Sequence, residues 1–229
     1  MADDDSDAVT AAKMQIEESI ASTDRGRSVE STQRRAQLHA LLSNLEALNS
    51  LSEPARDARM EGSWVVHYTD APPPSNGQFG IFRGIAKQVI DLKDKRYRNE
   101  LYVGGGGSST GPNNDGGDVQ GAWLTAVLDA SWNEWDGVYL DSADVEIQSS
   151  SLDNNERKYV GEDHGATTWK VDFVSLTLSI FHVPIFTQQF KKGTSRTWKM
   201  TYLDDDTRIV RAGKTGRGQD DWIFYMKRG

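Results

Sequence analysis

The sequence contains no cysteine, which excludes disulfide bonds, thiolate catalysis and zinc–sulfur sites. It has no apolar run near the ~18 residues that a membrane-spanning helix needs. Positive charge is also in short supply, because 26 Lys and Arg stand against 34 Asp and Glu, for a formal net charge of −8. A nucleic-acid-binding protein needs a basic surface, so nucleic acid is not an expected partner. Docking on a membrane surface through apolar side chains needs no positive charge and stays open.

The chain begins with an acidic segment, Met-Ala-Asp-Asp-Asp-Ser-Asp, which resembles neither a secretory signal nor a transit peptide. We therefore expect either a protein that stays where it is made or a targeting segment that is missing from the sequence. The chain has 229 residues, enough for one large domain at ~100–200 residues per domain. Seven Trp, seven Tyr and seven Phe are enough to line a large apolar interior.

The pattern of the chain predicts a division into a disordered acidic start (1–7), a helical region (8–55) and a β-domain (56–229). Helices are expected over 8–22 and 28–49, with a break at Arg25-Gly26-Arg27. The second helix carries an apolar stripe at helical spacing, formed by Leu38, Leu41, Leu42, Leu45 and Leu48. Five leucines at roughly 1.5–3 kcal/mol each would not stay in water, so this helix must lie against the rest of the fold.

From Gly62 the apolar period changes to two, which predicts strands. Strands are expected at 64–69, 79–91, 100–103, 123–128, 137–140, 145–148, 167–181, 197–203, 208–211 and 222–227, with a flexible Gly-rich loop at 104–121. Short strands separated by turn residues are typical of an antiparallel β-barrel or sandwich.

One long strand pattern, VDFVSLTLSIF at 171–181, divides into two faces. One face carries Val174, Leu176, Leu178 and Ile180, and the other carries Phe173, Ser175, Thr177, Ser179 and Phe181. In a closed barrel the mixed face lines a cavity or forms the outer surface, and the sequence leaves both open.

Several motifs that would carry chemistry fail on inspection. Gly213-Lys214-Thr215 resembles the end of a phosphate-binding loop, but Arg208 stands where that loop needs glycine, and a strand pattern follows instead of a helix. It is better interpreted as a glycine turn between the last two strands. The four histidines are scattered and show no metal-binding spacing: His39, His67, His164 and His182. The run Asp204-Asp205-Asp206 fits a hairpin turn and not a calcium loop.

Three stretches together resemble the plastid lipid-associated protein family, also called fibrillins. They are the helical region with its Arg-Gly break, MEGSWVVHYTDAPP at 60–73, and WKMTYLDDDTRIVRAGKTG at 198–216. Residues 88–91 are similar to the family's second strand region. Ala212 stands where the family usually has glycine, and the 104–121 loop looks like an insertion.

The resemblance implies a lipocalin-like antiparallel β-barrel, with the N-terminal helices packed on it, in the chloroplast. Family members associate with thylakoids, plastoglobules or stroma and are thought to bind or carry carotenoids, quinones and lipids. Gly62-Ser63-Trp64 also resembles the lipocalin pattern in which an arginine from the last strands packs over the tryptophan at the closed end. Arg208 and Arg211 are the candidates, and such a cation–π contact is worth about 0.5–2 kcal/mol.

The resemblance and the alternation of aromatic residues give a candidate ligand-binding set. It consists of Trp64, Val66, Tyr68, Gln88, Trp123, Phe173, Phe181, Trp198, Met200, Tyr202, Arg208 and Arg211. Core packing is the simpler alternative for the aromatic members, and a solvated strand end is the alternative for whichever arginine faces outward. No catalytic residue, metal ligand or firm cofactor is expected beyond a bound carotenoid, quinone or lipid.

Three functions follow, in order of preference. The first is a non-enzymatic carrier of an apolar small molecule. The second is a peripheral scaffold subunit docked on a thylakoid complex or plastoglobule coat, with a membrane surface as a further partner, through the 28–49 helix and the 104–121 loop. The third is an enzyme acting on isoprenoids with strand carboxylates, for which the sequence offers Asp91, Glu146 and Asp172 without showing that they converge.

Overall fold

The computed structural model describes residues 2–28, 31–104, 121–140, 156–158, 163–215 and 220–229. Two α-helices come first, and three short 3-10 helices follow: α1 (Ala2–Ile20), α2 (Thr32–Ala47), η1 (Pro54–Arg56), η2 (Ala58–Met60) and η3 (His164–Ala166). The strands are β1 (Gly62–Thr69), β2 (Gln78–Phe79), β3 (Phe82–Asp91), β4 (Arg96–Val103), β5 (Leu124–Glu134), β6 (Val138–Leu140), β7 (Glu156–Lys158), β8 (Thr168–Ile180), β9 (Val183–Gln189), β10 (Ser195–Leu203), β11 (Thr207–Lys214) and β12 (Asp220–Arg228).

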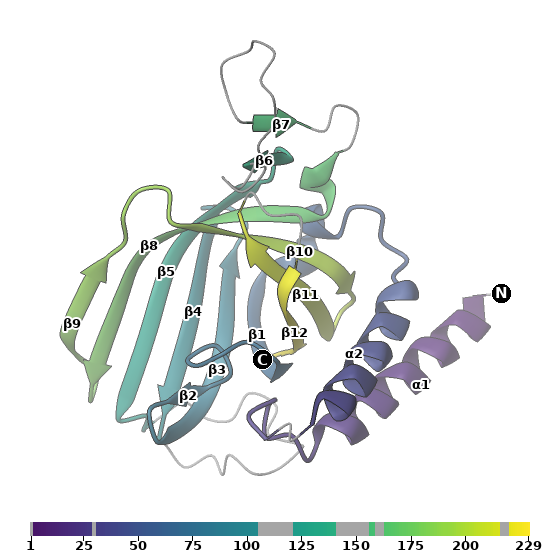
Figure 1. The fold of residues 1–229 in the computed structure, drawn as a ribbon, viewed down its shortest axis with the longest axis horizontal. Coiled ribbons are helices and arrows are strands. Elements are labelled where there is room, and N and C mark those ends of the chain that lie inside the picture. The colour runs from purple at the N-terminus through teal and green to yellow at the C-terminus, as the bar shows by residue number, and fades with distance from the viewer. Residues whose placement is uncertain (1, 29–30, 105–120, 141–155, 159–162, 216–219) are drawn as a thin grey trace.

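Eight of the strands close into an antiparallel barrel in the order β1-β12-β11-β10-β8-β5-β4-β3 (Figure 1). The ring closes because β3 pairs back onto β1, with Gly62 opposite Ile90 and Val65 opposite Lys87. Strand β2 extends the barrel beyond β3, and β9 pairs with β8 outside the ring. The predicted fold class, a β-barrel with N-terminal helices, is therefore confirmed.

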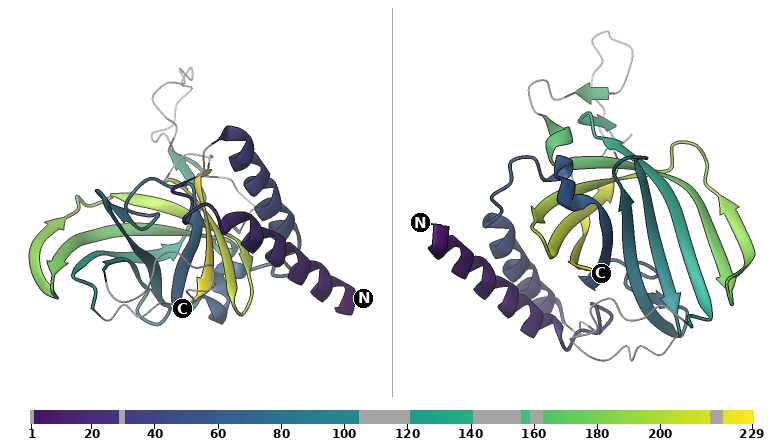
Figure 2. Two further views of the ribbon diagram at one scale, coloured as in Figure 1. Left: turned by 90° about the horizontal axis from the view of Figure 1, so that it is seen from below. Right: turned by 180° about the vertical axis from the view of Figure 1, so that it is seen from behind.

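The barrel wall has two unequal sides. Strand β8 pairs with β10 only over Thr168–Asp172, but its partner β5 follows it to Ile180. Beyond Asp172 the free side of β8 is taken by β9, from Ser175 to Ile180. Strands β3, β4, β5, β8 and β9 thus form a broad curved sheet that extends past the shorter side of β1, β10, β11 and β12 (Figures 1 and 2).

A β-bulge in β8 changes which side chains share a face, so the two faces predicted for residues 171–181 differ from the structure. Asp129 of β5 opposes Ser175, and the next residue, Ala130, opposes Phe173, so Val174 is an extra residue in β8. Phe173 therefore turns to the inside together with Leu176, and Val174 is exposed. Neither predicted face is kept along the whole strand, because a period-two pattern does not reveal where an extra residue breaks it.

The two helices cover the outer face of the shorter side of the barrel (Figure 2). Leu38, Leu42 and Leu45 of α2 are fully buried there. Their cluster also contains residues from α1 and the strands: Ile16, Ile20, Tyr68, Tyr202, Ile209, Ile223 and Tyr225. The expectation that the apolar stripe of the second helix lies against the fold is confirmed.

The Arg-Gly break between the helices is a docking turn on the barrel. Gly26 has a φ of +91°, and a Cβ at this position would lie 1.9 Å from the Thr69 carbonyl oxygen, so only glycine fits. The Arg25 guanidinium donates to the Val66 carbonyl, and Arg27 Nη1 donates to the Gly77 carbonyl at 3.1 Å. These contacts fix where the helices meet β1.

Some predicted boundaries differ from the structure. Helix α1 begins at Ala2, so it includes most of the 1–7 segment that was predicted to be disordered. Strand β9 was not predicted, because its sequence VPIFTQQ contains proline and no clean alternation. The 145–148 strand and all but the ends of the 104–121 loop lie outside the described residues.

Candidate ligand-binding site in the barrel

One half of the barrel interior is filled by its own side chains. Trp132 and Trp169 stack there with ring centroids 3.9 Å apart. The turns η1 and η2 lie over this end, where the Trp169 indole donates to the Ala55 carbonyl at 3.0 Å and the Trp64 indole donates to the Met60 carbonyl at 3.1 Å. We call this half the closed end, because its tryptophans leave little room for another molecule.

Trp64 lies beside two guanidinium groups at the closed end. The Cζ atom of Arg208 is 5.3 Å from the centre of the Trp64 ring, which confirms the predicted contact between the first strand and a late arginine. Arg228 is nearer still, at 4.3 Å. Arg228 was not among the residues predicted from the sequence. In a closed antiparallel barrel the end of the last strand lies beside the start of the first, and Trp64 does pair with Arg228, so topology could have found it.

Arg208 is an unusual buried charge. Its side chain donates to the Gln88 amide oxygen, but the Nε and Nη1 atoms have no hydrogen-bond partner among the described residues. Burial lowers the pKa of Arg208 to about 10, and the nearby positive charge of Arg228 adds to this effect. The group still carries its charge at neutral pH and contacts no carboxylate in the part of the chain that the structure describes.

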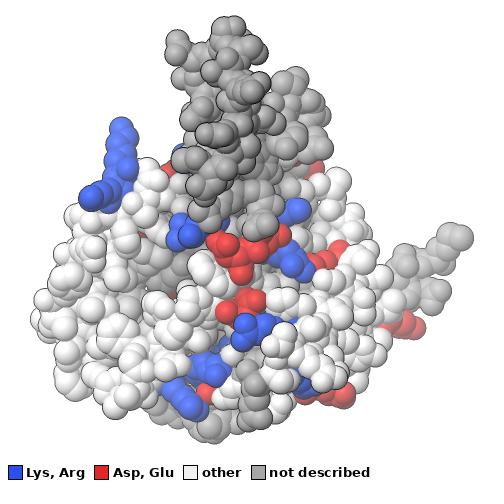
Figure 3. Space-filling view, in the orientation of Figure 1, with Lys and Arg blue, Asp and Glu red and all other residues white. Residues whose placement is uncertain are grey.

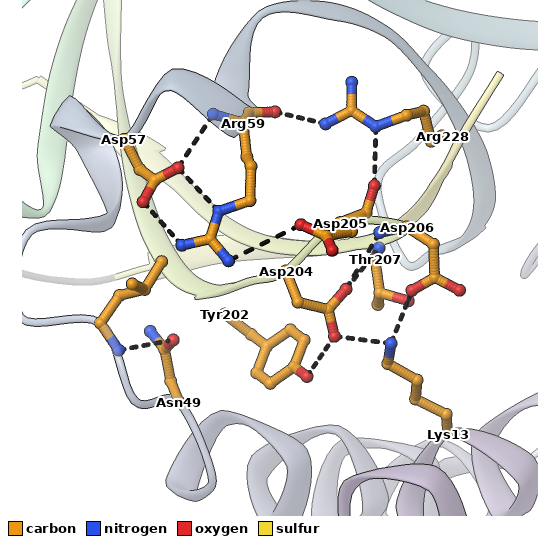
Figure 4. A network of polar contacts seen from close by, with 11 residues as sticks. Lys13, Asn49, Asp57, Arg59, Tyr202, Asp204, Asp205, Asp206, Thr207 and Arg228 are labelled. Atoms are coloured by element: carbon orange, nitrogen blue, oxygen red, sulfur yellow. Dashed lines mark hydrogen bonds and ion pairs between the residues drawn. The ribbon is translucent and has the colours of Figure 1, made fainter. Parts of the chain in front are cut away.

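The turn between β10 and β11 ties the closed end to the helices (Figure 4). The carboxylate of Asp204 accepts hydrogen bonds from the backbone N–H of Asp206 at 3.1 Å and of Thr207 at 2.9 Å, which confirms the predicted turn. The Tyr202 hydroxyl also donates to Asp204, at 2.5 Å. Lys13 of α1 lies 2.6 Å from carboxylate oxygens of both Asp204 and Asp206.

The other half of the barrel encloses a cavity of about 310 Å³. All eight barrel strands contribute to its walls, and the segment after β1 and Phe190 after β9 complete them. The lining residues are mostly apolar: Val66, Pro72, Pro73, Pro74, Ser75, Ala86, Lys87, Gln88, Asn99, Glu100, Leu101, Ala126, Leu128, Phe173, Leu176, Phe190, Arg196, Trp198, Ala212, Trp222 and Phe224. Ligand sites in proteins span roughly 300–1,000 Å³, so the cavity is at the small end of this range.

The cavity wall includes small residues facing large ones. Ala86, Ala126 and Ala212 leave the space, and Trp198, Trp222 and Phe224 supply aromatic surface. Trp198 packs against Phe224 with ring centroids 5.1 Å apart. The wall is therefore suited to an apolar molecule, and its local polarity comes from Ser75, the amides of Gln88 and Asn99, and the charged residues Lys87, Glu100 and Arg196.

The structure separates the predicted site residues into four places. Val66, Gln88, Phe173 and Trp198 line the cavity. Trp64, Met200 and Arg208 are buried at the closed end. Trp123 and Phe181 lie at the opposite end, where the backbone N–H of Phe181 donates to the Trp123 carbonyl at 2.8 Å.

The remaining three predicted residues, like those at the two ends, do not line the cavity, and they lie under the helices. Tyr68 and Tyr202 belong to the cluster between the barrel and the two helices. Arg211 faces α2, where its Nη2 lies 2.7 Å from the Glu46 carboxylate. Register shifts in β1 between Val66 and Tyr68, and in β10 between Met200 and Tyr202, put these tyrosines on the outer face. A strict period-two alternation of side chains along each strand would place both tyrosines inside the barrel.

The described part of the chain offers no clear catalytic chemistry in the cavity. Asp91 and Asp172 do not line it, and Glu146 lies outside the described residues. Glu100 touches the cavity wall and accepts a hydrogen bond from the Tyr102 hydroxyl at 2.7 Å. Among the described residues, no group of three His, Asp or Glu side chains could hold a metal ion. None of the described helices is long and apolar enough to cross a membrane.

The closed eight-stranded barrel, its filled end and its apolar cavity define a lipocalin-like barrel. Residues 10–109 match the PAP_fibrillin family model, and this match confirms the resemblance to the plastid lipid-associated proteins. The chain thus carries a PAP_fibrillin segment that runs from α1 to just beyond β4. No curated protein matches the chain.

The family match supports a cellular compartment and a general type of function for this chain. Fibrillins are plastid-associated proteins, which supports the chloroplast as the compartment of this chain. They are generally structural or lipid-associated rather than enzymes. A lipid-associated role fits both the family and the barrel fold.

Proposed function

We propose that this protein binds or carries one apolar small molecule, a carotenoid, quinone or lipid, without enzymatic activity, at thylakoids or plastoglobules. The observation that carries the proposal is the cavity of about 310 Å³ with apolar walls in the open half of the barrel. A cavity lined by aromatic and aliphatic side chains with a few amides is the usual environment of an apolar ligand with a polar end.

The size of the cavity indicates that it encloses only part of a long ligand. At the small end of the range for ligand sites, it holds a ring or one flexible chain and not a long rigid molecule. A longer ligand leaves the cavity along the extended sheet, where Leu176, Leu178 and Ile180 are only partly buried. A quinone or a single-chain lipid therefore fits the cavity better than a whole carotenoid does.

Two alternatives lose support. A scaffold docked through the second helix would need an apolar helix face, but Leu38, Leu42 and Leu45 are fully buried against the barrel. An enzyme using paired strand carboxylates would need them in the cavity, but Asp91 and Asp172 lie elsewhere. The carrier function is the one that the cavity supports.

The test is a fluorescence titration of the purified full chain. Trp198 and Trp222 line the cavity, so a ligand that enters will quench tryptophan emission. The probes are a benzoquinone with a decyl tail, palmitate and β-carotene. We expect saturable quenching by the quinone, displacement of the quinone by palmitate, and weaker binding of β-carotene.

A cavity-filling variant provides the specific control. Ala212→Phe puts a ring into the cavity and should weaken quinone binding at least tenfold, and Ala126→Phe serves as a second filling variant. Ala36→Phe, the same change at an exposed position of α2, should bind as the parent does. Binding that is absent from the parent, or unaffected in both filling variants, would overturn the proposal.

A further inference from the structure

The end of the barrel opposite Trp64 exposes large apolar side chains on its turns. Ile81, between β2 and β3, is 89% exposed, and Phe181, between β8 and β9, is 71% exposed. Val183, Ile185 and Phe186 of β9 are also exposed. Residues 78–83, 121–124 and 180–186 together form what we call the open rim.

The three segments of the open rim are neighbours in space. The Phe82 and Trp123 rings meet edge to face, with centroids 5.0 Å apart. Phe181 is joined to Trp123 through the backbone hydrogen bond of 2.8 Å, and Val183 pairs with Ile180. Figure 1 shows the ends of these strands along the lower edge of the broad sheet.

The open rim differs in charge from the rest of the chain. Its 17 residues include no Asp or Glu, although the whole chain has 34. Arg83 and His182 are its ionisable side chains, and Arg83 is paired with Asp24 at 2.8 Å. The wall over β8 and β9 is correspondingly almost free of charged side chains in Figure 3. A surface of this kind is matched by an uncharged apolar partner.

The shape of the open rim favours a lipid surface over a protein partner. Phe181 and His182 both have positive φ values, 47° and 65°, which is the backbone of a tight hairpin turn that projects its side chains from the tip. Apolar side chains on the tips of separate turns can enter a lipid layer one by one, whereas a protein interface needs a continuous complementary face.

The open rim is also continuous with the cavity. Leu101 and Ala126 line the cavity and belong to the same cluster as Val103 and Leu124. Phe79 and Trp123 of the rim pack against that cluster. An apolar path therefore leads from the cavity along the inner face of the broad sheet to the exposed tips.

We infer that the open rim is the surface by which this protein docks on a lipid bilayer, with the cavity mouth turned to the lipid and the closed end turned away. The docking depends on insertion of apolar tips and not on charge. The reason for this orientation rests on the proposed function, since a carrier needs an apolar route between membrane and cavity.

The test is flotation of the full chain with phosphatidylcholine vesicles at low and high salt. We expect the parent to float at both salt concentrations, and the double variant Ile81→Ser/Phe181→Asn to bind at least tenfold less. Asparagine tolerates positive φ, so the turn should keep its form. Met14→Ser, which removes an apolar side chain that is 59% exposed on α1, is the matched control and should float like the parent.

The orientation has its own readout. Vesicles with brominated acyl chains should quench the emission of Trp123, and Trp123→Phe should remove most of that quenching. Thermal unfolding of each variant establishes that it is folded. A parent that does not float, a double variant that floats equally, or a parent dimer that the double variant dissociates would overturn the inference, the last by assigning the rim to a second copy of the chain.

Vesicle flotation and quinone binding test the docking surface and the carrier function independently. If the double variant loses vesicle binding but retains quinone quenching in solution, both are supported. If the parent floats through the rim but binds none of the three probes, the rim assignment stands and the carrier function does not. If it binds the quinone but does not float, the carrier function stands alone.

Discussion

The two ends of the barrel are built from opposite chemistry. The closed end combines buried tryptophans with arginines and a carboxylate-rich turn whose polar groups are paired, although Arg208 remains only partly hydrogen-bonded (Figure 4). The open end has apolar tips, no carboxylate among the described residues of its rim and a cavity beneath them. Tight packing and paired charges stabilise a fold, whereas exposed apolar surface and empty space do not.

This difference indicates that one end of the barrel stabilises the fold and the other end binds. The closed end, together with the helices packed on the outer face of the shorter side, holds the ring of strands in place. The open end, which contributes least to stability, is free to serve binding. Substitutions at the two ends should therefore separate stability from binding.

The largest expected effect is at Trp64. Trp64→Ala removes a fully buried indole and should lower the free energy of unfolding by about 3–5 kcal/mol. Phe181→Asn, at an exposed turn, should change it by no more than about 0.5 kcal/mol. Urea denaturation followed by circular dichroism measures both, and equal losses at the two positions would contradict the division.

A pair of substitutions at Arg208 has the next largest effect. Arg208→Ala should cost about 2–4 kcal/mol, because it leaves a hole beside Trp64 and an unpaired Gln88 amide. Arg208→Met keeps the volume and removes a guanidinium that is only partly hydrogen-bonded, so it should cost about 1 kcal/mol or less. If methionine proves as damaging as alanine, the charge itself is required at the closed end.

The smallest expected effect is the acid response of the closed end. Hydrogen bonds from Arg59 lower the pKa of Asp57 to about 2, and although burial alone would raise the pKa of Asp206, hydrogen bonds from Lys13 and Thr207 leave it below its ordinary value. Carboxylates with pKa values below the unfolded ~3.9 stabilise the fold above that pH. Stability should therefore hold near neutral pH and fall from about pH 4 toward pH 2.

Two variants locate this acid response. Asp206→Asn should flatten the dependence of the unfolding free energy on pH, since it removes one of the depressed carboxyl groups. Phe181→Asn should leave the dependence unchanged, because the open rim has no carboxylate. A pH dependence that Asp206→Asn does not alter would show that these ion pairs do not stabilise the closed end.

The sequence predicted the architecture well, because its signals were periodic. The stripe of α2 and the alternating strands follow directly from side-chain spacing. The contact between Trp64 and Arg208 came from a family resemblance, and the structure confirms it.

The site was harder to predict, because single residues break the period. The bulge at Val174 and the register shifts near Tyr68 and Tyr202 each reverse the side to which a side chain points. Small residues were also overlooked: Ala86, Ala126 and Ala212 create the cavity by what they leave empty. Aromatic residues are easily chosen as ligand contacts from a sequence. The position of a cavity, however, depends on how small and large side chains pack in three dimensions.

The most direct test of the central claim is to purify the protein from plastids, extract it with organic solvent and identify the extract by mass spectrometry. The account predicts close to one apolar molecule per barrel in the parent, and its loss in Ala212→Phe expressed in the same plastids. A parent barrel that yields no such molecule, or equal yields from the two forms, would contradict the claim that the open half of the barrel is a binding site.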